Sequence, residues 1–287
     1  MSLIRRLIRR ARLRHLALRR RVKVLEARVD SLEETVYEPE PEQPIKEYIA
    51  GVDAYWRTGN IDWVKVRQAG YRFAILKATE GVDYLTGDKR DWFIANARAA
   101  KGAGMLVSFY HFGRPDTGPS VEQDAREEAE DFLKAVEMAG GPTPGCPLWL
   151  DLEKDVYNRT RAEVQEWITV FLSVVDAAYP CGLYVSNRWM EKWALDSQEF
   201  SLLPDGTRRG SWVARYGQNL GDQWIDSPPD WVDQYDPEEK VPAGFVLDIH
   251  QYGSKVPVPG YPSPGDANIS PGQVWADWGV DPKLLAP

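Results

Sequence analysis

From residue 48 onward, short apolar runs alternate with segments that carry the signatures of helices. Two of these segments open on capping boxes, at 120–123 and 160–163, which predict helices reaching to about residues 138 and 178. Further helices are expected at 60–66 and 91–102. Because strands and helices alternate along the chain, we expect a parallel sheet with helices packed against it.

The apolar runs are interpreted as the strands of an α/β barrel. They lie at 49–53, 72–80, 105–112, 146–151, 182–186, 211–216 and 245–252. Residues 217–244 are rich in Pro, Asp and Trp and are expected to be irregular. The sequence therefore predicts a barrel with a regular first half and a helix-poor second half.

The first four runs turn polar or aromatic where they end. In α/β barrels the functional groups lie at the carboxyl ends of the strands, so these side chains should encircle one site. They are Asp53, Lys77, Glu80, Tyr110, His111, Asp151 and Glu153.

Asp151 and Glu153 follow the buried run at 146–150 and are two residues apart. Side chains two apart in a strand project from the same face, so the two carboxyl groups should repel and at least one pKa should be raised. A protonated acid beside an ionised one is the arrangement that glycoside hydrolysis requires. A strand end with two solvated acids is the plain alternative.

Composition and charge narrow the function classes. The chain has 287 residues and a net charge of −8, but residues 1–28 hold eleven Lys or Arg and one acid, so the rest is strongly acidic. This argues against nucleic-acid binding by the main domain. With three His and no spaced pair, neither a metal nor a cofactor is expected. The acids at 122–131 are interpreted as a solvated helix face.

The N-terminal residues predict a separate arm. Apolar residues recur at spacings of four and three over residues 4–36, which favours a parallel coiled coil, with 18–36 as the expected homodimer seam. Residues 1–23 are basic and amphipathic, so binding to an anionic membrane or envelope surface is a second expectation. We divide the chain into this arm (1–37), a Pro/Glu linker (38–47) and the barrel domain (48–287).

Two further expectations concern cellular context. The chain has no apolar stretch long enough to span a membrane, and its basic N-terminus lacks the apolar core of a secretory signal, so synthesis in the cytoplasm without a signal peptide is expected. Cys146 and Cys181 each precede a predicted strand. A disulfide between them is conceivable, and two free thiols are favoured.

At this point the residues resemble the glycoside hydrolase family 25 lysozymes, also called N-acetylmuramidases, over about residues 48–280. The matching blocks are Gly51-Val52-Asp53, Ile61-Asp62-Trp63, Lys77-Ala78-Thr79-Glu80-Gly81, Tyr110-His111-Phe112, Leu150-Asp151-Leu152-Glu153, Gly182-Leu183-Tyr184, Trp212-Val213-Ala214-Arg215-Tyr216 and Gln251-Tyr252-Gly253. His250 departs from the pattern, since the family usually has Trp before Gln-Tyr.

The resemblance implies a modified barrel of five βα units followed by three strands. It implies hydrolysis of the β-1,4 bond between N-acetylmuramic acid and N-acetylglucosamine in peptidoglycan of a host cell wall, in the setting of bacteriophage-driven lysis or, alternatively, of a bacterial autolysin. Glu153 matches the general acid, with Asp151, Asp53 and Asp266 as the other catalytic acids. The expected substrate-binding residues are Tyr110, Tyr184, Tyr216, Lys77, Glu80 and Gln251.

Several alternatives stay open. Asp151 could attack the sugar as a nucleophile, or it could orient the substrate's own 2-acetamido group for attack. A substrate-assisted chitinase would carry a further Asp at position 149, where this chain has Trp. A non-catalytic wall-binding protein on a coiled-coil stalk is the main competing function.

Overall fold

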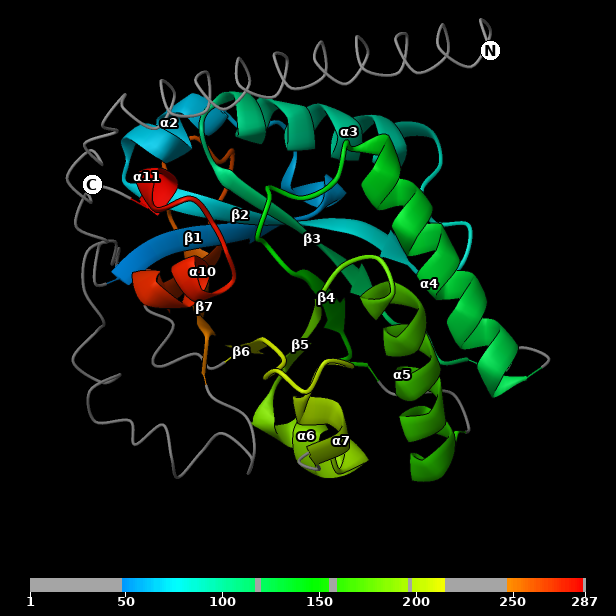
Figure 1. The fold of residues 1–287 in the computed structure, drawn as a ribbon. Helices are drawn as coiled ribbons and strands as arrows, with labels where there is room; N and C mark the ends of the chain where they lie inside the picture. Colours follow the sequence, from blue (N-terminus) through cyan, green and yellow to red (C-terminus); the bar gives the residue numbers. More distant parts are fainter. Residues whose placement is uncertain (1–47, 117–119, 155–158, 196–197, 215–246, 286–287) are drawn as a thin grey trace, which may run out of the picture. The chain divides into compact units, whose positions relative to one another are not determined.

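The computed structural model describes residues 48–116, 120–154, 159–195, 198–214 and 247–285. Within these ranges the strands close into a barrel in the order β1 to β8 (Figure 1). Their bounds are β1 Tyr48–Ala54, β2 Tyr71–Glu80, β3 Leu106–Phe112, β4 Leu148–Asp151, β5 Cys181–Val185, β6 Ser211–Ala214, β7 Ile249–Val256 and β8 Gly265–Pro271.

One strand of the barrel runs against all the others. Neighbours from β1 to β7 are parallel, whereas β8 is antiparallel to both β7 and β1. Parallel neighbours need a crossover connection, and the β7–β8 connection at 257–264 is too short and too rich in proline to provide one. The expected modified α/β barrel is confirmed, and its last strand returns as one arm of a hairpin.

Helices α3, α4 and α5 run along the outside of β2, β3 and β4 (Figure 1). The helix bounds are η1 Trp56–Thr58, α2 Trp63–Gln68, α3 Gly87–Gly102, α4 Val121–Met138, α5 Arg161–Asp176, α6 Asn187–Trp193, α7 Gln198–Ser201, α10 Gly272–Asp277 and α11 Pro282–Leu285. None of these helices is long and apolar enough to cross a membrane.

The caps explain where the helices begin. Ser120 accepts a hydrogen bond from the backbone N–H of Gln123, and Thr160 forms a reciprocal capping box with Glu163, so both predicted helix starts are confirmed. The prediction for α2 began three residues early, because Asp62 is its N-cap and accepts from the N–H of Lys65.

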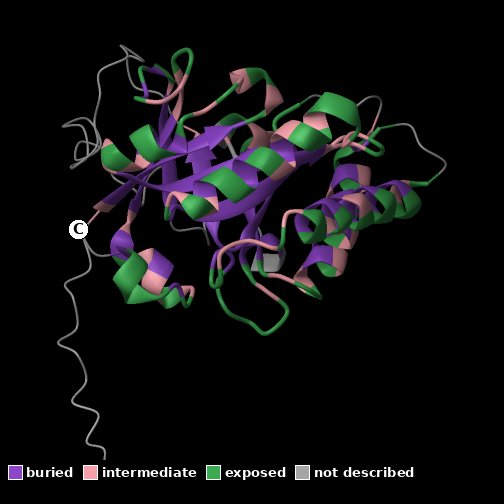
Figure 2. Cartoon of the chain, turned by 90° about the horizontal axis from the view of Figure 1, so that it is seen from above, coloured by how far each residue is buried: buried purple, intermediate pink, exposed green. Residues whose placement is uncertain are grey.

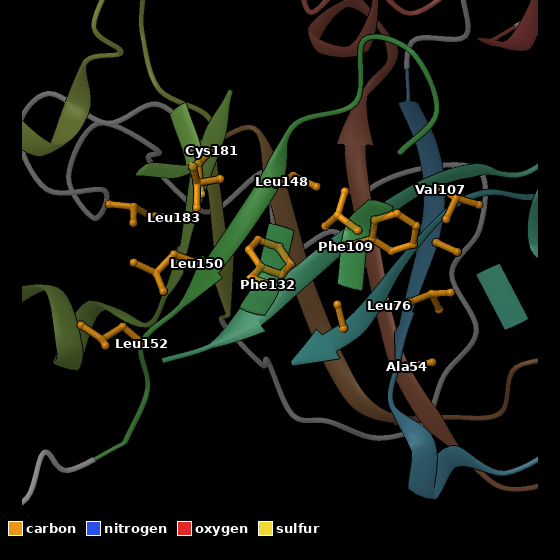
Figure 3. Close-up of a cluster of buried hydrophobic side chains, with 14 of the residues drawn as sticks. Ala54, Leu76, Val107, Phe109, Phe132, Leu148, Leu150, Leu152, Cys181 and Leu183 are labelled. Atoms are coloured by element: carbon orange, nitrogen blue, oxygen red, sulfur yellow. The ribbon is translucent and has the colours of Figure 1, made fainter. Parts of the chain in front are cut away.

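The core has two parts, one inside the barrel and one between barrel and helices. Figure 3 shows part of the outer layer, with Leu150 of β4, Phe109 of β3 and Phe132 of α4. Inside the barrel, Gly51 and Gly182 leave room for large rings, since a Cβ there would lie 2.1 Å from Phe73 and 2.3 Å from Trp149. Figure 2 shows the result, with buried strands and exposed outer helix faces.

One expectation about α4 is wrong. Asp124 and Glu128 are buried rather than solvated, with 7% and 1% of their surface exposed. The two residues are four apart and share a helix face with Ala125, Ala129 and Phe132, which packs against the barrel. Their hydrogen-bonding partners are His111 for Glu128, at 2.7 Å, and Trp167 for Asp124, at 2.9 Å.

Cys146 and Cys181 are buried free thiols, as favoured from the sequence. The arm at 1–37, the linker at 38–47 and Tyr216 lie outside the described residues. The homodimer seam at 18–36 and the envelope-binding surface at 1–23 therefore remain predictions.

Candidate active site

Polar side chains from seven strands meet at one rim of the barrel. The carboxyl ends of parallel strands share an edge, and antiparallel β8 brings its amino end to the same edge. The residues are Asp53 of β1, Lys77 of β2, Tyr110 of β3, Asp151 of β4, Tyr184 of β5, Gln251 of β7, and Asp266 and Asn268 of β8, with Glu153 just beyond β4. Glu80 joins them through its contact with Lys77, so the sequence-predicted residues that the structure describes are brought together, with one exception. The prediction for His111 was wrong, because its side chain points to the outer face of β3 and contacts Glu128 of α4.

Asp53 is buried and held by two amide donors. Gln251 Nε2 and Asn268 Nδ2 each donate to Asp53 Oδ2 over 2.8 Å. Burial raises the pKa of Asp53 to about 6, while these two hydrogen bonds act in the opposite direction. The charge of Glu153 raises it further. Asp53 can therefore change its protonation state near neutral pH.

Asp151 is the most deeply buried acid of the site, with 4% of its surface exposed. Burial raises its pKa well above the usual range, and the charge of Glu153 adds to this, whereas Lys77 opposes it. Its Oδ1 atom has no hydrogen-bond partner among the described residues. A buried acceptor without a donor is costly, so the atom is suited to a donor that a ligand brings.

Glu153 lies on the solvent side of Asp151. The Tyr184 hydroxyl is 3.3 Å from Glu153 Oε2 and 3.0 Å from Gln251 Oε1, and its single proton can serve either acceptor. The pKa of Glu153 is raised, as expected, chiefly by desolvation, with Tyr184 and Lys77 acting against it. The expected cause was the charge of Asp151, but in the free protein that repulsion raises the pKa of Asp151 instead.

Lys77 is the buried cation of the rim. Its Nζ lies 2.6 Å from Glu80 Oε2, and burial lowers its pKa to about 8, while the charge of Asp151 acts against the shift. Glu80 also pairs with Arg114. Glu80 therefore fixes Lys77 in place beside the carboxyl groups.

Asp266 holds a proton at neutral pH. Burial, with the charges of Asp53 and Glu153, raises its pKa to about 9. Several carboxyl groups with raised pKa values in one ring cannot all be ionised at once. The site therefore supplies both a proton donor and a carboxylate, the pair that acid–base chemistry on a glycosidic bond needs.

Two residues of this network were not predicted, Trp212 and Asn268. Trp212 Nε1 donates to Asn268 Oδ1 over 2.8 Å and so orients the amide that binds Asp53. The Trp212 ring packs on Tyr184, with ring centres 4.3 Å apart, and on Tyr110, at 5.9 Å. The position of Asn268, two residues after Asp266 on the same face of β8, was the available signal.

His250 does not belong to the site. Gln251 points to Asp53 inside the barrel, so alternation places its neighbour His250 on the outer face, where its ring lies near Tyr252. The departure from the family pattern at this position therefore leaves the rim unchanged. Within the described ranges, no group of three or more His, Cys, Asp or Glu side chains is arranged to hold a metal ion.

Comparisons with known proteins agree with this geometry. The sequence model of "Glycosyl hydrolases family 25" matches residues 52–261. Lysozyme M1 of Streptomyces globisporus is 40% identical over 128 residues, which is 43% of this chain and only 40% of that protein's own length.

Solved structures give the same fold. A bacterial lysozyme from Streptomyces coelicolor superposes with a TM-score of 0.57 at 25% identity, covering 77% of this chain and 90% of that one. The catalytic domain of an endolysin from a bacteriophage of Listeria monocytogenes gives a TM-score of 0.59 at 20% identity, covering 81% and 98%.

Proposed function

The chain belongs to glycosyl hydrolases family 25, and from this premise we propose that it cleaves the β-1,4 bond between N-acetylmuramic acid and N-acetylglucosamine in peptidoglycan. The observation that carries the proposal is the meeting of Asp53, Asp151, Glu153 and Asp266 at one rim of the barrel. Carboxyl pairs with separated protonation states are the chemical requirement for hydrolysing a glycosidic bond.

Glu153 is the proposed general acid. It lies closer to solvent than Asp151, the acid at the end of β4. Its raised pKa favours the protonated form, and Tyr184 fixes its Oε2 atom. It donates its proton to the glycosidic oxygen as the bond breaks, and then removes a proton from the attacking water.

Asp151 is proposed to orient the 2-acetamido group of the muramic acid, whose carbonyl oxygen attacks the anomeric carbon as the glycosidic bond breaks. Water then attacks the same carbon, the bond from the carbonyl oxygen to it breaks, and the acetamido group is restored. Two observations favour this role over direct attack by Asp151. Its raised pKa makes it a poor anionic nucleophile, and its Oδ1 atom is a free buried acceptor in the described part of the site. An acetamido N–H donating to Asp151 would lower the pKa of Asp151. Of the two neighbouring carboxyl groups, Asp151 would then be ionised and Glu153 would keep its proton.

The proposal is tested with purified peptidoglycan and mass spectrometry of the released fragments. We expect the wild-type chain to release fragments that end in reducing N-acetylmuramic acid. Glu153→Gln keeps the shape but cannot donate the proton, so release should fall by about 10²–10⁴-fold. Glu166→Gln, at an exposed position of α5, is the matched control and should cleave like the wild type.

The outcomes separate the competing functions. Fragments that end in reducing N-acetylglucosamine would contradict the proposed bond. Binding to peptidoglycan without release of any fragment would favour the non-catalytic wall-binding protein. Undiminished release by Glu153→Gln would show that another group is the acid.

The proposed setting is lysis of a bacterial host wall in a bacteriophage cycle. It is supported by the sequence of residues 1–23, whose basic residues suit contact with an anionic envelope, whereas the rest of the chain is acidic. Replacing Arg5, Arg6, Arg9 and Arg10 by Gln should reduce lysis of intact cells and leave digestion of purified peptidoglycan unchanged. Equal loss on both substrates would contradict a role in envelope contact.

A further inference from the structure

A pocket beside the acidic rim has the opposite charge. It encloses about 480 Å³. Its walls come from the segment after β1, the end of β2, the start of α3 and the segment after β3. The lining residues are Tyr55, Trp56, Arg57, Lys77, Glu80, Tyr84, Lys89 and Arg114.

The pocket has a surplus of positive charge, with four cations and one acid in its walls. That acid, Glu80, already pairs with both Lys77 and Arg114. Arg57 and Lys89 have no carboxylate partner among the described residues. This local excess stands in a domain whose overall charge is strongly negative. An anionic ligand would therefore be attracted to this pocket and repelled by the surface around it.

Aromatic rings hold the two unpaired cations in the wall. Lys89 Nζ lies 4.0 Å from the centre of the Tyr84 ring, and the Arg57 guanidinium lies 5.1 Å from the centre of the Trp56 ring. A ring face attracts a cation but leaves its N–H groups able to donate elsewhere. The pocket thus offers oriented donors together with apolar ring surface.

The pocket adjoins the proposed bond-cleaving site. Lys77 lines it and also acts electrostatically on Asp151 and Glu153. Tyr55 follows Asp53 by two residues, so the wall begins where β1 ends. A group attached to the sugar bound at the acids can therefore reach the pocket.

We propose that this pocket binds the carboxylates of the stem peptide carried by the muramic acid residue. The inference rests on the proposed function, because peptidoglycan is the substrate that brings this group. Each muramic acid bears, through its lactyl ether, a short peptide with free carboxyl groups. Arg57 and Lys89 donate to these carboxylates, and the Trp56 and Tyr84 rings pack against the peptide's aliphatic parts.

The test compares two substrates and three proteins, all made as the full chain. The substrates are peptidoglycan with its stem peptides and the same glycan after an amidase has removed them. The proteins are the wild type, the double variant Arg57→Gln/Lys89→Gln, and the control Arg90→Gln. Arg90 neighbours Lys89 on α3 but pairs with Asp91 and does not line the pocket.

With stem peptides present, we expect the double variant to raise KM by about three- to tenfold, as two solvent-accessible ion pairs would, with kcat unchanged. On the peptide-free glycan the three proteins should give the same KM. Because the amidase leaves a lactyl carboxylate on each muramic acid, added salt should raise the wild-type KM on both substrates, and by more on the peptide-bearing one.

The other outcomes overturn the inference in distinguishable ways. If the wild type cleaves both glycans and the double variant matches it on both, the pocket does not bind the stem. The KM difference between the wild type and the double variant could disappear when anionic wall polymers are stripped from the substrate, yet persist when only the peptides are removed. In that case the ligand is a polymer phosphate instead. If the wild type cleaves neither glycan, the proposed function itself has failed.

Discussion

Asp53 on β1 and Asp266 on β8 are direct partners in the antiparallel register that closes the barrel. The pairing places two acids side by side at the rim, and it exists only because β8 runs against the other strands. The pKa of Asp266 rises to about 9, chiefly by burial and then by the charge of Asp53, while the pKa of Asp53 lies at about 6. Between these two values the pair holds one proton, which resides on Asp266.

Asp266→Asn should be tolerated near neutral pH. Asn resembles the protonated carboxyl group that Asp266 presents there, so we expect most of kcat/KM to remain. The wild type should lose activity on the alkaline side as Glu153 and Lys77 lose their protons, and again as Asp266 ionises near pH 9. Only the step near pH 9 should be missing in the variant. The measurement is kcat/KM against pH. A variant as inactive near neutral pH as Glu153→Gln would mean that a carboxylate is required at position 266.

Asn268→Ala should move the acid limb of the same profile. Asn268 donates to Asp53 and lowers its pKa, so loss of this donor should raise the pKa of Asp53 above about 6. If catalysis needs ionised Asp53, the acid limb of the curve of kcat/KM against pH moves to higher pH by about one unit. This is the size expected for a hydrogen bond to a charged group. Trp212→Phe, which keeps the packing but not the N–H donor to Asn268, should shift the limb in the same direction by less. An unchanged limb in both variants would show that Asp53 does not control it.

The sequence was sufficient for the acids at the strand ends but not for what connects them. The alternation of side chains in strands places Asp151 and Glu153 on one face, and strand–helix repetition predicts a barrel. The contact from Trp212 through Asn268 to Asp53 joins β6, β8 and β1, which are distant in sequence. It depends on how the barrel closes, and local patterns carry no information about that closure.

The α4 prediction failed for a different reason. Acids were interpreted as solvated because charged side chains are seldom buried without a partner. Asp124 and Glu128 lie on the face that packs against β3 and α5, with Trp167 and His111 as partners. Their spacing of four, next to Ala125 and Ala129, was a visible signal of the buried face, but the partners belong to other elements of the chain.

Glu128→Gln should change how stability depends on pH. Burial raises the pKa of Glu128 from 4.5 to about 8, so the folded state binds more protons than the unfolded state across that interval. The contribution of Glu128 to stability is therefore greatest below pH 4.5 and is lost as the pH rises to about 8. Gln cannot ionise, and its oxygen can accept from the backbone N–H of Arg114 and from His111.

We expect Glu128→Gln to raise Tm above the wild type near pH 8 and to have little effect near pH 5. A gain of 1 kcal/mol would appear as about 2–4 °C in a domain of this size. Thermal unfolding at both pH values measures it, and Glu122→Gln, at an exposed position of the same helix, is the control. His111, whose pKa falls to about 3 by burial, remains neutral at both pH values and does not add to the difference. An equal Tm change at both pH values would attribute the effect to packing rather than to ionisation.

Asp151 distinguishes the two chemical routes. If it orients the acetamido group, Asp151→Asn retains a carbonyl oxygen in place of the free Oδ1 acceptor, so kcat should fall by about 10²–10³-fold, as for removal of one charged contact. Asp151→Ala removes the acceptor altogether, so its kcat should be lower still. If Asp151 is the nucleophile, Asn and Ala are equally unable to attack, and both variants should have the same residual rate. The measurement is the rate of fragment release on one peptidoglycan preparation, with Tm measured for both variants to confirm folding. Only the orienting role predicts that Asp151→Asn releases fragments faster than Asp151→Ala.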